Sequence, residues 1–545
     1  MKRFLFPFLI SVVGIIVWYP ILKVFYLQDE WQGLGHIFIE GVSHPFAGAN
    51  FFQLIFGEDR SLARLLGLFL FGRFPLNALP VAIFSLTFHL LNSCLVFFLA
   101  NKIFKKGILS FIAAAAFMIS SVSANAVYWF STSVGTLPAT TLIIIAIFNY
   151  FEYLKDGFVK RLYLVFGLLF VSLFFKEIAT FLFIFLPIFS LLFKRGKVGV
   201  FVKKYWIFII FFILLVGFRI LQLKSMQGPN ALFITGSSSN FSTTLLTRAI
   251  LYPLTSFSLE FFPAPVLVNF ARGVTSNYYP FIDVGQFDLI SQTAVLDLVA
   301  AILSLIMFFV FNFFVNRERS ALRVRIVFWF LFIIFSFLPY IIISKTFSYL
   351  ESRYYYLSLV GASIIFSWFV SKMFESKRIL FKILGISIIS LYFFGQIKYL
   401  RADLGSVVKV SAERVNFIKQ IDLYIKPTQN PKNIFYISSD SDYYIVGNKI
   451  PFQQGTGYTL MILSWGKLPL PGKFLTDPFL WDIGSQGYKE DNGVGFGYFS
   501  DEGELRMAIK NHNLSRSSLK AFFYDSKKEV LVDVTNQVSN EVFKK

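Results

Sequence analysis

Charged side chains and cysteines are scarce in this chain of 545 residues. Charged residues make up 15% of it, whereas they make up about 25% of an ordinary soluble domain. The single cysteine, Cys94, excludes an internal disulfide, and its apolar neighbours indicate a packing residue. Apolar residues are abundant instead, at 56% of the chain with a mean hydropathy of +0.64. Runs of about 20 apolar residues recur through positions 1–400, so we predict a polytopic α-helical membrane protein.

Acidic residues are outnumbered, with 31 Asp and Glu against 51 Lys and Arg, a net charge of +20. In a soluble chain this excess would suggest nucleic acid. Here the basic residues cluster between apolar runs, which is typical of cytoplasmic loops, and no nucleic-acid partner is expected. The sequence also has no glycine-rich phosphate loop, no HExxH motif and no Cys/His cluster, so no metal site is predicted.

Alternation of basic clusters and polar loops predicts about eleven transmembrane helices. The N-terminus would lie in the cytoplasm, and residues 245–262 are interpreted as an interfacial or re-entrant helix. The expected location is the plasma (inner) membrane. The basic clusters assigned to the cytoplasm are Lys102–Lys106, Lys155–Arg161, Lys194–Lys204, Arg317–Arg325 and Lys372–Lys382.

Composition changes near Tyr399, which divides the chain into a membrane domain, 1–400, and a domain of ordinary charge, 401–545. In the second domain NIFYISS and YYIVG are typical of short strands, and ELRMAIKNH is typical of an amphipathic helix. We therefore expect a soluble α/β domain. By the same count of spans it would lie outside the cytoplasm.

An acidic pair, Asp29-Glu30 in FYLQDEW, follows the first apolar run directly. Acidic residues often lie where a span meets water, which is the plain alternative. Adjacent residues on a helix do not share a face. One carboxylate can therefore point into a site while the other binds structure or acceptor.

Two further charged motifs adjoin apolar runs. Lys176-Glu177 interrupts VSLFFKEIATFLFIFLP, and charges at membrane depth are costly enough to suggest function. Glu351 and Arg353 precede three tyrosines in YLESRYYY, where the guanidinium suits a phosphate ester at headgroup depth. The alternatives are a self-neutralising external hairpin and an arginine extending to the interface.

Three segments in this order resemble the polytopic GT-C glycosyltransferases: the acidic motif, KEIATFLFIFLP and ESRYYYLSLVGASII. The resemblance covers about residues 1–400 and is greatest to the membrane part of protein O-mannosyltransferases of the tetratricopeptide-bearing type and related bacterial enzymes. FPLNALPVAIFSLTFHLLNSCLVFFL, with His89 and Asn92, is similar to that family's second span. The domain after Arg401 lacks an obvious tetratricopeptide pattern.

The resemblance implies transfer of a sugar from a polyprenyl-phosphate carrier to a protein or glycan acceptor outside the cytoplasm. Asp29 matches the catalytic position with Glu30 beside it, and Lys176 and Arg353 match positions near the lipid phosphate. Supporting roles fall to Glu177, Glu351, His89 and Asn92. SSVSANAVYWFSTS departs from the family pattern, because Asn125 and Ser133 stand where relatives often have an acid and a base. That departure leaves open whether a divalent cation takes part.

Independent chemical reasoning agrees with a transferase, since a carboxylate can act as general base and cations can stabilise a phosphate leaving group. Such a displacement inverts the anomeric centre. Other functions stay open: a transporter or flippase, a polymerase or ligase for surface polysaccharide, or a membrane-anchored binding protein.

Overall fold

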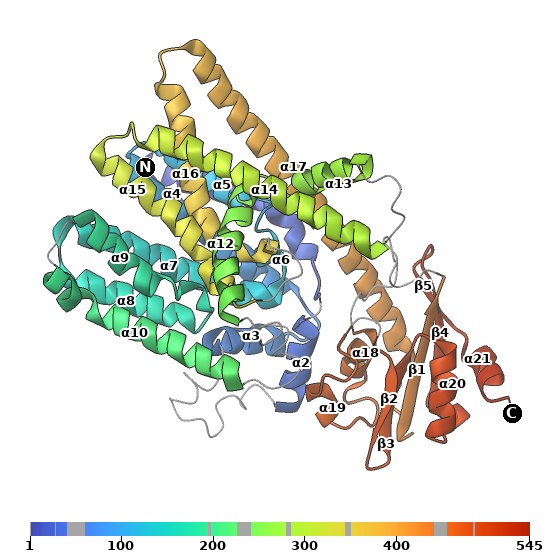
Figure 1. Cartoon of the computed structure of the whole chain (residues 1–545). Helices are drawn as coiled ribbons and strands as arrows, with labels where there is room; N and C mark the ends of the chain where they lie inside the picture. The colour runs from blue at the N-terminus through green and yellow to red at the C-terminus, as the bar shows by residue number, and fades with distance from the viewer. Residues whose placement is uncertain are drawn as a thin grey trace.

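The computed structural model describes residues 2–27, 29–40, 60–194, 198–225, 241–278, 285–343, 350–440, 455–482 and 485–544. Helices dominate, and a small sheet domain lies at one end of the helical part (Figure 1). The helical part is made of α1 (Lys2–Trp18), η1 (Tyr19–Lys23), α2 (Asp29–Glu40), α3 (Ser61–Arg73), α4 (Leu79–Phe104), α5 (Gly107–Ile119), α6 (Asn125–Tyr128), α7 (Phe130–Asp156), α8 (Val159–Leu173), η4 (Glu177–Ala179), α9 (Leu182–Lys194), α10 (Val198–Ser225), α12 (Phe241–Leu259), α13 (Ala264–Tyr278), α14 (Gly285–Val315), α15 (Ser320–Ser336), η6 (Leu338–Tyr340), η7 (Ser352–Tyr354), α16 (Ser358–Glu375) and α17 (Ile379–Tyr424).

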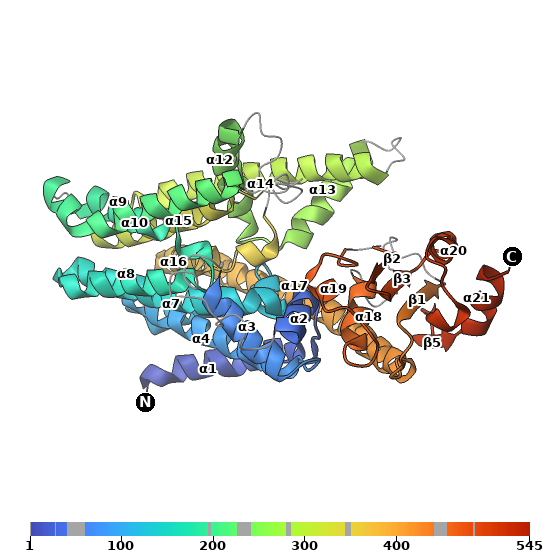
Figure 2. The ribbon, with the colours of Figure 1, turned by 90° about the horizontal axis from the view of Figure 1, so that it is seen from below.

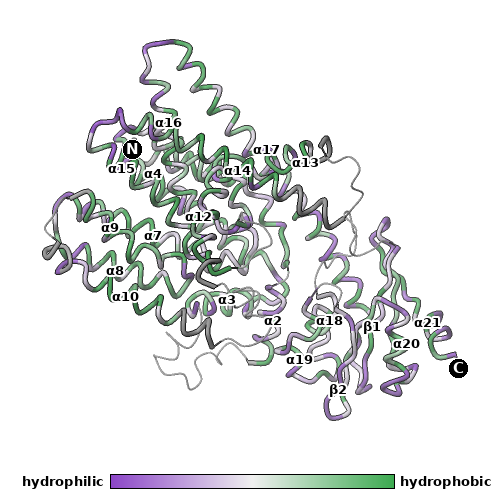
Figure 3. Tube along the Cα trace, in the orientation of Figure 1, coloured by the Kyte–Doolittle hydropathy of each residue, from purple (hydrophilic) through white to green (hydrophobic). Residues whose placement is uncertain are grey.

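Apolar helices of membrane-spanning length are present, as expected. Within the described residues, six helical segments are long and apolar enough to cross a membrane: Leu5–Lys23, Leu79–Phe104, Phe130–Asp156, Ala294–Val315, Ser320–Tyr340 and Ile379–Tyr424. Two shorter apolar helices are Gly107–Ile119 and Glu177–Leu192. Hydropathy along the chain separates these helices from the more hydrophilic sheet domain (Figure 3). A membrane-embedded protein follows, while the number of eleven spans and the sidedness stay predictions.

The segment interpreted as interfacial or re-entrant forms most of α12, which is not among those six helices. α12 ends at Leu259, and Pro263 precedes the start of α13. Both helices pack on α14. Proline fits the break because it cannot donate the hydrogen bond that a continuous helix requires. Whether this pair enters the membrane stays a prediction.

Helix α17 continues through the expected domain boundary between residues 400 and 401. Its later part buries residues at helical spacing, among them Leu404, Ser411 and Arg414. The Ser411 hydroxyl accepts a hydrogen bond from the backbone N–H of Phe25 at 2.9 Å, and Arg414 Nη1 donates to the carbonyl oxygen of Tyr26 at 3.4 Å. This half of α17 therefore holds the extended segment that leads into α2.

The C-terminal domain is a five-stranded mixed sheet of order β2-β3-β1-β4-β5. β1 pairs in parallel with β3 and β4, and β2 and β5 are antiparallel edge strands. Figure 2 shows the sheet and its helices beside the end of α17. Its elements are β1 (Lys432–Ser439), α18 (Thr456–Ser464), α19 (Lys473–Thr476), β2 (Gly487–Asp491), β3 (Val494–Phe499), α20 (Glu502–Asn511), η8 (Arg516–Ser518), β4 (Leu519–Asp525), β5 (Val530–Asp533) and α21 (Thr535–Val542).

Alternation along β1 places apolar residues on both faces of the sheet. Ile434 and Tyr436 join a core with α20 and α21, whereas Phe435 and Ile437 join the large core shared with the helical part. The predicted strand NIFYISS is confirmed as β1, and the predicted helix ELRMAIKNH is confirmed within α20 to its end at Asn511. The predicted strand YYIVG lies outside the described residues.

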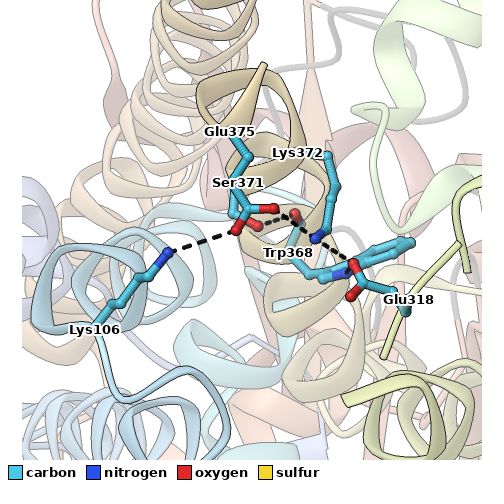
Figure 4. Close-up of polar contacts among 6 residues, drawn as sticks. All are labelled: Lys106, Glu318, Trp368, Ser371, Lys372 and Glu375. Carbon is cyan, nitrogen blue, oxygen red and sulfur yellow. Dashed lines mark hydrogen bonds and ion pairs between the residues drawn. The ribbon is translucent and has the colours of Figure 1, made fainter. Parts of the chain in front are cut away.

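Three of the basic segments meet at one end of the helical part (Figure 4). Lys372 pairs with Glu318 and, at 2.7 Å, with Glu375, which also lies 3.5 Å from Lys106 Nζ. Trp368 Nε1 donates to the Glu318 carboxylate at 3.0 Å. Glu318 is the most buried of these acids, at 6% side-chain exposure against 48% for Glu375. This network joins the start of α5, the turn between α14 and α15, and the end of α16.

We predict that Glu318→Ala lowers the free energy of unfolding of the detergent-solubilised protein by about 1–3 kcal/mol. The substitution leaves the Trp368 N–H without its acceptor and Lys372 with one fewer partner. Glu375→Ala is the matched control, and its exposed pairs are each worth about 0–1 kcal/mol. Unfolding followed by intrinsic fluorescence measures both. Equal losses in the two variants would contradict the assignment of Glu318 as the centre of the network.

Candidate functional site

Glu30 is a structural carboxylate at the first turn of α2. It is 1% exposed, its Oε1 accepts a hydrogen bond from the backbone N–H of Ser131 at 2.7 Å, and its Oε2 accepts from that of Leu27 at 3.1 Å. Burial raises its pKa, and the bond from Ser131 is the largest opposing influence. Since Ser131 lies in the first turn of α7, Glu30 also receives the favourable field of that helix N-terminus. Glu30 therefore ties α2 to α7.

Asp29, by contrast, has a largely uncommitted carboxylate. It is half-buried, and its contact with Ser131 Oγ is long, at 3.5 Å from Oδ2. Burial raises its pKa, while the positive charge of Arg353 is the main influence that lowers it and the negative charge of Glu351 raises it. A half-buried carboxylate with a raised pKa, within electrostatic range of a cation, is suited to accept a proton.

Arg353 reaches this site from η7, a segment more than 300 positions away in sequence. Its guanidinium lies 4.6 Å from the ring centre of Trp129 and 5.1 Å from that of Tyr354, so it is stacked against aromatic faces. Its Nε is 2.8 Å from Glu351 Oε2, and 23% of the side chain is exposed. Stacking fixes the plane of the guanidinium while its edge can still donate hydrogen bonds.

Lys176 is a buried residue that lies near the same Tyr354 ring. Its Nζ donates to Thr136 Oγ1 at 2.6 Å and lies 6.0 Å from the Tyr354 ring centre. The pKa of Lys176 is lowered to about 7, mainly by burial and in part by the nearby charges of Arg60 and Arg353, which Glu177 opposes. The ammonium group is thus poised between its charged and neutral forms near neutral pH.

Glu177 is occupied by a different partner. Both of its carboxylate oxygens accept hydrogen bonds from Arg60, at 2.8 and 2.9 Å. Arg60 directly precedes α3, and the N–H groups of Leu62 and Ala63 in that helix bond to the carbonyl oxygen of Phe174. Glu177 therefore fixes α3 against the turn that carries Lys176.

His89 and Asn92 lie beneath the site and contact it through Tyr356. The Tyr356 hydroxyl is 2.9 Å from His89 Nδ1 and accepts from Asn92 Nδ2 at 3.2 Å. The other His89 nitrogen is 2.9 Å from the carbonyl oxygen of Met118, which can only accept, so Nε2 carries the hydrogen. In that tautomer Nδ1 accepts a hydrogen bond from the Tyr356 hydroxyl. This chain fixes a residue three positions beyond Arg353.

The structure thus places Asp29, Arg353 and Lys176 in one electrostatic cluster, with Glu351 at its edge and Glu30 and Glu177 as ties. Asn125 and Ser133 are used elsewhere: Asn125 pairs with Tyr128, and Ser133 Oγ lies 2.6 Å from Ser85 Oγ. Within the described residues no group of three or more His, Cys, Asp or Glu side chains has the arrangement of a metal site.

Three residues of the site were not among those predicted: Trp129, Ser131 and Tyr354. Trp129 and Ser131 connect the arginine to the acidic pair, because Trp129 stacks on Arg353 and Ser131 contacts both Asp29 and Glu30. The indole N–H of Trp129 is buried and has no hydrogen-bond partner among the described residues. Both residues belong to SSVSANAVYWFSTS, the segment that departs from the family pattern.

No model of a known protein family matches this chain, and no curated protein sequence matches it. The resemblance to GT-C enzymes accordingly stays a prediction from the sequence motifs.

We predict opposite effects on stability for the two adjacent acids. Glu30→Gln presents an amide NH₂ to one of two backbone N–H groups and should cost about 1–3 kcal/mol. Asp29→Asn should leave stability unchanged or raise it, because burial disfavours the charged form that it removes. Thermal unfolding of both purified variants decides this, and a larger loss for Asp29→Asn would reverse the assigned roles.

The pKa of Asp29 is predicted to depend on the charges of Arg353 and Glu351. The infrared carboxyl band that Asp29→Asn removes should titrate above the ordinary value of 3.8. Arg353→Ala should move this midpoint up by removing a cation, Glu351→Gln should move it down by removing an anion, and Arg353→Lys should leave it closer to wild type. Identical midpoints in all variants, or shifts of the reverse sign, would exclude the electrostatic contact. Because folding raises this pKa, the contribution of Asp29 to stability declines as pH rises from the unfolded to the folded midpoint.

Proposed function

We propose that this protein is a membrane glycosyltransferase that moves a sugar from a polyprenyl-phosphate carrier to a hydroxyl group of a protein or cell-surface glycan. One observation carries the proposal: Asp29 and Arg353, from segments far apart in sequence, lie within electrostatic range of each other. Lys176 in turn lies within electrostatic range of Arg353. A proton acceptor and two phosphate-binding cations are the groups that such a transfer requires. The proposed site lies at the extracytoplasmic side of the plasma (inner) membrane.

In the proposed reaction the acceptor oxygen attacks the anomeric carbon while its proton passes to Asp29. The bond between that carbon and the phosphate oxygen breaks, and polyprenyl phosphate leaves with the bonding electron pair. Arg353 and Lys176 stabilise the charge that develops on the phosphate, so no acid is needed for the leaving group. A single displacement inverts the configuration at the anomeric carbon.

The depth of the cluster supports a lipid-linked donor. α16 begins at Ser358, five residues after Arg353. It ends at Glu375, which belongs to the network of ion pairs around Lys372 (Figure 4). Its 18 residues span about 27 Å, close to the thickness of a hydrocarbon core. Arg353 and the network therefore lie near opposite ends of α16, a mostly buried helix that is not among the six candidate spans. A polyprenyl tail among such helices would present its phosphate at the level of Arg353.

Lys176 adds a feature of donor binding. With a pKa of about 7, the unliganded lysine is only partly protonated at neutral pH. A phosphate beside it favours the charged form, so donor binding takes up a proton. The gain in charge occurs only when the donor is present, which limits the cost of a buried cation in the empty site.

A transporter or flippase for a lipid-linked substrate is the second candidate, and one observation favours it. Glu260 lies at the break between α12 and α13 with no solvent exposure, and its Oε2 has no hydrogen-bond partner within the described part of the chain. Its Oε1 accepts from the Ser358 hydroxyl. Interrupted helices with buried carboxyl groups are frequent in transporters.

The decisive experiment supplies purified protein in lipid nanodiscs with radiolabelled polyprenyl-phosphate sugars and an extract of cell-envelope acceptors. We expect label to pass to the acceptor, and Asp29→Asn to reduce the rate by roughly 10²–10⁴-fold. Asp403→Asn is the matched control, because Asp403 accepts a hydrogen bond from Tyr128 at 3.0 Å and lies outside the cluster. It should keep most of the activity.

Transfer from a nucleotide sugar in membranes stripped of polyprenyl-phosphate sugars would overturn the proposal. Movement of the lipid-linked sugar across the bilayer without bond cleavage would favour the transporter instead. Unchanged transfer by folded Asp29→Asn would remove Asp29 as the base.

A further inference from the structure

The C-terminal domain packs directly on the helix that carries the acidic pair. α2 contacts both α18 and α19, which lie between β1 and β2 in the chain. Every residue of α18 is buried, although the domain is otherwise of ordinary polarity. Trp31 and Leu34 of α2 belong to the same hydrophobic core as Tyr458 and Phe474. The membrane part and the sheet domain are therefore joined through α2 by one continuous core.

The closest approach is at Gly35. A Cβ placed there would overlap the Tyr458 hydroxyl and lie 2.8 Å from the carbonyl oxygen of Leu475. Tyr458 is 2% exposed, and its hydroxyl donates a hydrogen bond to that same carbonyl oxygen. Packing around the ring and this hydrogen bond together hold the side chain in place. Only glycine allows α2 to lie this close to the domain.

A second glycine, Gly33, provides the comparison. A Cβ there would meet no atom of the described residues within 4 Å. Glycine in a helix interior lowers helix stability relative to alanine. At Gly35 the close approach of Tyr458 explains why glycine is present, whereas no contact within the described part of the chain explains it at Gly33.

Two contacts thus fix α2 along its length. Glu30 ties the first turn to α7, and Tyr458 holds the helix at Gly35, six residues and about 9 Å beyond Asp29. A helix this short moves as a stiff rod. A displacement at Gly35 therefore reaches Asp29, and it also changes the distance from Asp29 to Arg353.

We propose that Tyr458, through its contact with Gly35, is a positioning residue that sets the place of Asp29, so that the C-terminal domain is part of the framework of the site. The inference rests on the proposed function for its catalytic consequence. Its structural content, that the domain fixes α2, stands apart from that function and can be tested without it.

The experiment compares Gly35→Ala with Gly33→Ala in the full-length protein. Hydrogen exchange across residues 29–40 should be faster in Gly35→Ala and unchanged or slower in Gly33→Ala. With a polyprenyl-phosphate sugar as donor, Gly35→Ala should lower kcat by about 10²-fold, as expected for a displacement near 1 Å. The donor KM should change little, because Arg353 and Lys176 lie on other elements.

A second substitution makes the test specific to the contact. Tyr458→Phe removes the hydroxyl that the new methyl group would overlap, so Gly35→Ala/Tyr458→Phe should recover part of both the exchange protection and kcat. Recovery would be partial, because the ring carbon that carries the hydroxyl would still be 3.0 Å from the methyl. If Gly35→Ala does not fold, Tyr458→Leu tests the contact between Tyr458 and Gly35 by removing it. This variant should also speed hydrogen exchange across α2.

Equal exchange in Gly35→Ala and Gly33→Ala, or no change in Tyr458→Leu, would overturn the positioning role. Faster exchange with unchanged kcat would overturn the link to Asp29. If the wild-type protein transfers no sugar, the proposed function fails, and the exchange comparison still decides whether the domain fixes α2.

Discussion

The site depends on one buried interaction. The carboxylate of Glu30 accepts hydrogen bonds from the backbone N–H groups of Leu27 and Ser131. It joins the segment after the first apolar helix to the start of α7, and each hydrogen bond to a charged acceptor is worth about 1.5–3 kcal/mol. Without it, the first turn of α2, which carries the adjacent Asp29, would lose its tie to α7. α17 completes this arrangement from the other side by holding Phe25 and Tyr26.

The charges around Asp29 are balanced rather than simply attractive. Burial raises the pKa of Asp29 and is the main cause that lowers the pKa of Lys176 to about 7, so in both groups it favours the neutral form. Arg353 keeps its place by stacking on Trp129 and by pairing with Glu351. In the proposed transfer, an incoming phosphate would meet a guanidinium group that is already oriented.

Much of this architecture follows from the sequence. Apolar runs predicted the membrane-embedded helices, and alternation predicted β1, because both patterns record which faces are buried. The end of α17 was not predictable, since the change in composition near Tyr399 marks the end of apolar surroundings and a helix can continue beyond them. Helical spacing indicated that Asp29 and Glu30 have different roles. Their assignment required Ser131, a partner 101 residues beyond Glu30.

The part played by Trp129 could not be read from the sequence at all. A single tryptophan near a helix start is common, and only the fold brings it over Arg353. The same holds for Tyr458, whose approach to Gly35 depends on how the sheet domain meets α2. Contacts between distant elements are set by packing, and a single sequence carries no periodic signal for them.

The most direct test of the account is a cryo-electron microscopy structure in lipid nanodiscs with a non-transferable phosphonate analogue of a polyprenyl-phosphate sugar. The account predicts that the phosphorus lies in contact with Arg353 and Lys176, with the anomeric carbon directed toward Asp29. A phosphonate bound at the opposite ends of the apolar helices, near Lys372 and Glu318, or one that leaves Arg353 paired only with Glu351, would contradict it.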